Sequence, residues 1–155
     1  MNEANFWVII ENAWPQGEKL NQFQADVLRG EWSADSYELQ KQMLANLTSA
    51  FEQLDKDELL AFDRMLAQKL YDIDRADVHE YTDGSDDGFL YARGFIVSVG
   101  RDYYELVNKD PSRAIMDAEF EEFCYHSSRI YEQRFGAIPP FDVSRETGSN
   151  PTGWS

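Results

Sequence analysis

The residues best suited to chemistry lie in one short stretch, YTDGSDDGFLYARGF, at positions 81–95. Asp83, Asp86 and Asp87 place three carboxylates close together, and Arg93 follows. Carboxylates can hold a divalent cation or act as general acids and bases, and an arginine can bind an anionic group. Three interpretations therefore compete: a metal site, a catalytic or ligand-binding cleft, or only a turn and the start of a helix.

The helix start explains most of this acidic stretch. Ser85 is well placed as an N-cap, and the carboxylates that follow it would interact favourably with the positive end of the helix dipole. Apolar residues from Phe89 onward recur at helical spacing up to Val99. We therefore predict a helix over residues 86–99 that begins at the Ser85 cap, buries Phe89 and ends at Gly100.

Arg93 is less easily explained by a helix start. It lies four residues after Phe89 and therefore shares the apolar side of the predicted helix. Because an unpaired buried charge is costly, its guanidinium needs a partner. We expect a carboxylate in that role, from Asp86, Asp87 or another helix; an anion-binding arginine is the alternative.

The sequence offers few other groups of residues that could act in catalysis. His79 and His126 are far apart in the chain, and the acids at 83–87 lack the spacing of a calcium loop. Cys124 and His126 are two positions apart, so they would not face each other on a helix. We expect no catalytic residue, no metal and no cofactor.

The elements that position these residues are all helical. Apolar spacing, caps and Gly or Pro stops predict a single-domain, all-α bundle of about seven helices over residues 1–136. The remaining residues, 137–155, have adjacent prolines and several turn formers, which predict an irregular tail. The expected helices lie near residues 6–13, 20–28, 33–54, 55–78, 86–99, 101–108 and 117–135.

Trp154 lies in this Pro/Gly-rich tail. It is either an exposed anchor for a partner or a side chain that folds back onto the helices. The candidate binding residues are therefore Asp83, Asp86, Asp87, Arg93 and Trp154, while Ser85, Phe89 and Gly100 are expected to be structural.

Charge narrows the class of partner. The 155 residues carry 29 acids and 14 bases, a net charge of −15. Such a chain repels nucleic acid and anionic membranes and attracts a basic protein, and the alternative is that the charge serves solubility alone. There is one cysteine, no long apolar run and no basic leader in MNEANFWVIIENAW, so we expect a cytoplasmic protein without disulfides.

The stretch SDDGFLYARGFIVSVGRDYYELVNKDP resembles the signature of a bacterial family, domain of unknown function 4240. The opening Phe6-Trp7 and the segment FEEFCYHSSRIYEQRFG are also similar to that family, so the resemblance spans most of residues 1–136. It implies a helical fold and a cytoplasmic bacterial setting, and it implies no established activity.

These features favour a non-enzymatic binding protein that associates with a basic protein. The specific hypothesis is an immunity protein that neutralises a cognate bacterial toxin by occluding its active site. The alternatives are a small hydrolase or ligand-binding protein that uses an Asp86, Asp87 and Arg93 cleft, and a passive regulatory or scaffold module.

Overall fold

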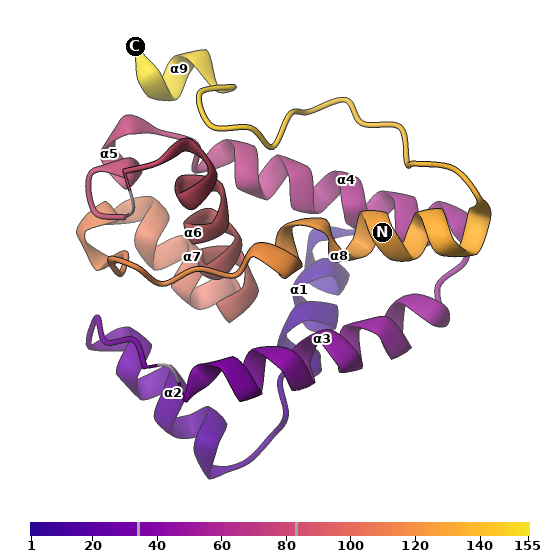
Figure 1. The fold of residues 1–155 in the computed structure, drawn as a ribbon, viewed down its shortest axis with the longest axis horizontal. Coiled ribbons are helices and arrows are strands. Elements are labelled where there is room, and N and C mark those ends of the chain that lie inside the picture. The colour runs from indigo at the N-terminus through magenta and orange to yellow at the C-terminus, as the bar shows by residue number, and fades with distance from the viewer. Residues whose placement is uncertain (34, 83) are drawn as a thin grey trace.

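The chain folds as a helical bundle. The computed structural model describes residues 1–33, 35–82 and 84–155, in which all regular structure is helical (Figure 1). The α-helices are α1 (Glu3–Ala13), α2 (Glu18–Leu28), α3 (Ser36–Glu52), α4 (Lys56–Asp72), α5 (Ala76–His79), α6 (Asp86–Val99), α7 (Arg101–Lys109), α8 (Glu121–Phe135) and α9 (Pro151–Trp154), with a 3₁₀ turn, η1, at Pro111–Arg113.

The all-α prediction is confirmed, and its seven helices correspond to α1–α4 and α6–α8. It missed the four-residue α9, and the single helix predicted over residues 55–78 is in fact two: α4 ends at Asp72, and the four-residue α5 follows. Two predicted starts were wrong. Helix α8 begins at Glu121 rather than near Asp117, whose φ of 65° a right-handed helix cannot contain. Helix α3 begins at Ser36, and neither Ser33 nor Ser36 caps it.

The central helix is α6, which packs against α1, α4, α7 and α8. Most of its residues are buried, as expected for a helix surrounded by others. Ser85 caps it as predicted, since its Oγ accepts a 2.9 Å hydrogen bond from the N–H of Gly88. Gly100, with a φ of 127°, ends α6 and turns the chain into α7.

Helix α8 lies very close to α6. A Cβ built on Gly94 would lie 2.4 Å from Sγ of Cys124 and 3.0 Å from the carbonyl oxygen of Phe120. Glycine therefore permits this approach, and Cys124 is completely buried at the crossing.

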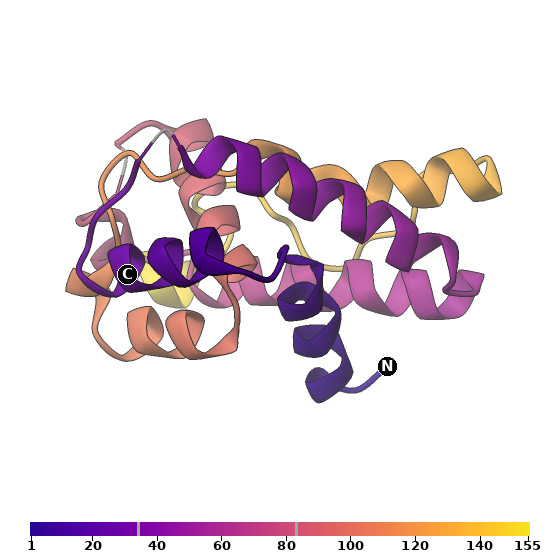
Figure 2. The same cartoon turned by 90° about the horizontal axis from the view of Figure 1, so that it is seen from below.

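Two long helices flank α8. Helix α4 starts with a capping box in which Asp55 and Glu58 each accept a 2.8 Å bond from the other's backbone N–H. It runs antiparallel to α3, and both pack on α8 (Figure 2). Among the described residues, no helix is both long and apolar enough to span a bilayer.

The tail lies on the bundle rather than extending away from it. After α8 it runs back over α4 and ends in α9 beside α5 (Figure 1). Most of it is irregular, as predicted, but Pro151 starts the single helical turn of α9, a position that suits its fixed φ.

Candidate functional site

The predicted carboxylates lie at the surface. Asp86 and Asp87 are exposed in the first turn of α6, where free N–H groups favour negative charge. Asp83 lies outside the described residues. Within the described chain, no group of three His, Cys, Asp or Glu side chains is placed to hold a metal ion.

Arg93 is fully buried, but its hydrogen-bond partners are not the predicted ones. Its Nη1 donates to the carbonyl of Leu70 at 2.9 Å, and its Nη2 donates to the carbonyl of Arg145 at 3.0 Å and to the hydroxyl of Thr147 at 3.2 Å. Its guanidinium also lies 4.7 Å from the centre of the Phe89 ring. Among the described residues Arg93 forms no direct ion pair, so the predicted contact with a carboxylate is not made, although Asp74 acts on it through its charge at longer range.

The physical reason is the end of α4. Leu70 lies in its last turn, where carbonyls lack intrahelical donors and carry partial negative charge. Burial lowers the pKa of Arg93, and the negative charge of Asp74 opposes that shift. Backbone carbonyls and the more distant Asp74 carboxylate therefore stabilise the buried guanidinium, in place of the predicted direct ion pair.

Trp154 folds back, which is one of the two outcomes that the sequence left open. Its Nε1 donates to the carboxylate of Asp74 at 2.9 Å, and its ring packs near those of His79 and Phe89. Arg93 and Trp154 therefore lie beneath or within the docked tail, whereas the carboxylates of Asp86 and Asp87 face solvent.

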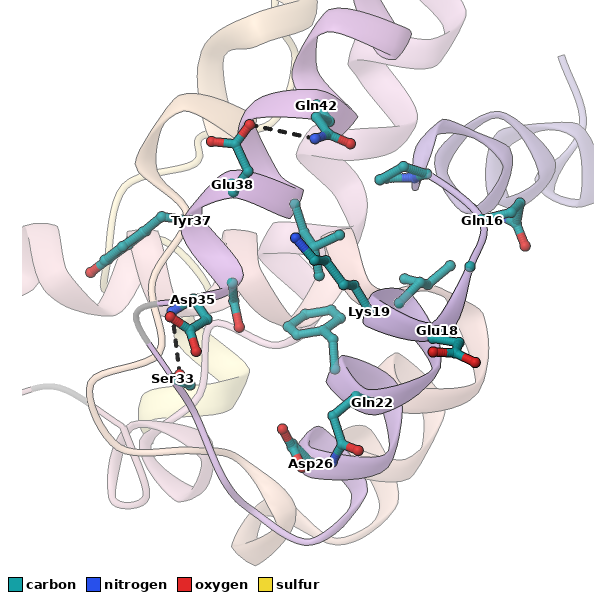
Figure 3. A pocket seen from close by; sticks show the side chains of 16 residues that line it. Gln16, Glu18, Lys19, Gln22, Asp26, Ser33, Asp35, Tyr37, Glu38 and Gln42 are labelled. Atoms are coloured by element: carbon teal, nitrogen blue, oxygen red, sulfur yellow. Dashed lines mark hydrogen bonds between the residues drawn. The ribbon is translucent and has the colours of Figure 1, made fainter.

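A large cavity lies elsewhere on the molecule. It is an open groove of about 1050 Å³ between α2 and the start of α3 (Figure 3). Pro15 and Gly17 form the turn between α1 and α2, and α2 lies at one end of the bundle, away from its centre (Figure 1), with Leu20, Phe23 and Val27 in the hydrophobic core. We call this cavity the α2–α3 groove.

Its lining is apolar at the base and acidic at the edges. Leu20, Phe23 and Leu39 are buried lining residues. Its charged lining residues are four acids and one base: Glu18, Asp26, Asp35 and Glu38, with Lys19. One of the four is already compensated, because Asp26 pairs with Arg29.

An aromatic side chain adds a contact surface to the groove. Tyr37 lines it and is 59% exposed. Its ring stands edge-on to Trp32 at 5.7 Å, and Trp32 in turn packs on Phe95 of the core at 5.0 Å. A supported, exposed tyrosine is a common anchor in protein interfaces.

Sequence reasoning missed this groove for a simple reason. Each acid reads as part of the solvated face of its own helix, and only the angle between α2 and α3 brings them together. The described lining contains no histidine or cysteine, and its chemistry is that of binding: hydrogen-bond acceptors, negative charge and an apolar base.

The two other side chains considered for chemistry, His126 and Cys124, lie in surroundings that suit a structural role. His126 is half-buried, with its Nε2 2.8 Å from Oγ1 of Thr48, and burial lowers its pKa. Burial raises the pKa of Cys124 to about 12, so its thiol is a poor nucleophile.

Comparison with known proteins identifies the family of the chain. The sequence profile of one family, described as "Protein of unknown function (DUF4240)", matches residues 1–133, which include the Ser85–Gly100 motif. No curated protein and no solved structure gave a significant match. The matched region covers α1 to nearly the end of α8, and the chain therefore belongs to the DUF4240 family.

Proposed function

We propose that this protein is a non-enzymatic binding protein that takes up a basic partner in the α2–α3 groove. In its most specific form, it is an immunity protein that acts in the bacterial cytoplasm and neutralises a toxin by covering its active site. The observation that carries the proposal is the lining of the groove, with four acids around an apolar base and an exposed tyrosine.

The chemistry of the groove supports a cationic protein segment. Lysine and arginine side chains would meet Glu18, Asp35 and Glu38, while an apolar side chain would cover Phe23 and Leu39. The net charge of −15 adds long-range attraction, which accelerates encounter with a basic protein. Rapid capture is what protection from a toxin requires.

The test is a titration of protection against the product of the neighbouring gene, purified as the candidate toxin. We expect full protection at about one equivalent of this protein. The double variant Glu18→Lys, Glu38→Lys should lose protection. The matched control is Glu52→Lys, Glu132→Lys, which changes the net charge equally at exposed positions outside the groove and should protect normally.

The same titration distinguishes occlusion of the toxin from the hydrolase alternative. A catalytic antagonist would protect far below one equivalent and would lose that ability in the variant Asp86→Asn, Asp87→Asn. That result would reject occlusion and place the function at the start of α6.

A further inference from the structure

Three charged side chains of the helical core have no role in the α2–α3 groove. Asp63, Asp74 and Arg93 are between 0% and 2% exposed, on α4, just after α4 and on α6. Charges at such depth need partners. All three obtain partners from one segment, residues 145–154 of the tail.

Asp63 binds a tail side chain. Its Oδ1 lies 2.7 Å from Nη2 of Arg145 and also accepts bonds from the hydroxyls of Ser127 and Ser128 at 2.6 and 2.8 Å. The same guanidinium donates to the carbonyls of Asp63 and Cys124. The planar guanidinium of Arg145 therefore binds a fixed set of acceptors between α4 and α8, which we call the Asp63 socket.

Asp74 and Arg93 bind the tail backbone in addition to the side chains of Trp154 and Thr147. The Asp74 carboxylate accepts N–H bonds from Gly148, Ser149 and Asn150 at 3.1, 2.8 and 3.1 Å. Arg93 donates to the carbonyl of Arg145. Main-chain contacts of this kind, combined with sockets for particular side chains, are how proteins hold extended peptides.

These polar contacts hold residues 145–150 of the tail, and the buried Pro139 and partly buried Trp154 add apolar contacts. Two of its large apolar side chains, Ile138 and Phe141, are 69% and 72% exposed. If the tail left, water would reach Asp74 and Arg93 again, so the lost hydrogen bonds would be offset by relief of their desolvation. Release therefore costs far less than exposing an apolar core of the same size. The tail also lies beyond the residues that the family profile matches.

We propose that the polar surface over α4, α6 and α8 is a peptide-binding site, and that residues 142–155 are its ligand in cis. The ligand class is an extended peptide with an arginine for the Asp63 socket, a turn of three successive N–H groups for Asp74, and a tryptophan. This proposal is independent of the α2–α3 groove.

The test uses the full chain with a protease site inserted between Gly136 and Ala137, which are both exposed. After cleavage of the folded protein, a fluorescent synthetic peptide of residues 137–155 is added and its anisotropy is followed. We expect the labelled peptide to exchange with the cut tail. An Arg145→Ala peptide should compete on the order of 100-fold less well. A Thr152→Ala peptide, which loses no side-chain hydrogen bond, should compete as well as the native one.

Hydrogen exchange in the uncut chain gives a second readout. We expect the amides of Gly148, Ser149 and Asn150 to exchange well before those in the centre of α4, and faster still in the Arg145→Ala protein. The proposal is overturned if these amides exchange only with global unfolding, if the cut core loses its helical circular dichroism when the tail leaves, or if the two variant peptides compete equally.

Discussion

Single side chains of this protein show how a buried cation can be held without a direct ion pair. Arg93 is surrounded by the end of α4, the face of Phe89 and the tail. Its partners come from positions 70, 145 and 147, which no local spacing rule connects to it. Its burial could be predicted from the apolar side of α6, whereas its partners could not.

Replacing Arg93 should therefore be costly. Arg93→Ala leaves three acceptors, one in α4 and two in the tail, without a donor, and we expect a loss of about 3 kcal/mol in the free energy of unfolding, measured by urea denaturation. The comparison is Asp86→Asn with Asp87→Asn. These surface changes should together cost less than about 1 kcal/mol. Equal losses in both proteins would contradict the contacts described for Arg93.

His126 makes stability depend on pH. Because burial lowers its pKa in the folded state, the unfolded chain, with an ordinary value near 6.5, takes up the proton first as the pH falls. The stabilisation is present above that value and is lost progressively below it. We expect wild type to lose more stability than His126→Gln between pH 7 and pH 5.5, measured by urea denaturation at each pH. Parallel curves for the two proteins would contradict this.

The sequence predicted the helices better than it predicted which distant residues contact one another. Caps such as Ser85 and Asp55 are local signals, and the helices that they start were found. Asp63 and Asp74 carry no such signal, because an acid in or after a helix usually faces water. Their burial depends on a tail that follows 70 or more residues later, and the α2–α3 groove likewise depends on an angle between helices.

The crossing of α6 and α8 gives a direct test of helix packing. Gly94→Ala puts a Cβ where Sγ of Cys124 now lies, and we expect it to cost about 1–3 kcal/mol of unfolding free energy. Adding Cys124→Ala should recover part of the loss, because the closest atom is removed. A double mutant as unstable as the sum of the two single ones would show that the helices do not meet at this point.

For the whole molecule, the excess of acids should govern how a partner arrives. The association rate with a basic protein should fall steeply between about 20 and 150 mM salt, since the screening length shrinks to roughly 8 Å. The dissociation rate should change much less, because it reflects the buried anchors. Stopped-flow measurements on the candidate toxin provide both rates. A dissociation rate that rises with salt as strongly as association falls would argue against an apolar base in the interface.

The close approach of α6 and α8 also makes Cys124 a natural probe of how often these two helices separate. Cys124 is the single cysteine of the chain and is fully buried. Burial raises the pKa of its thiol, so the thiol is almost entirely protonated at neutral pH. A disulfide reagent can reach it only when the two helices separate. The labelling rate, divided by that of a free cysteine peptide, therefore gives the fraction of time that the crossing is open, without denaturant and with no engineered probe.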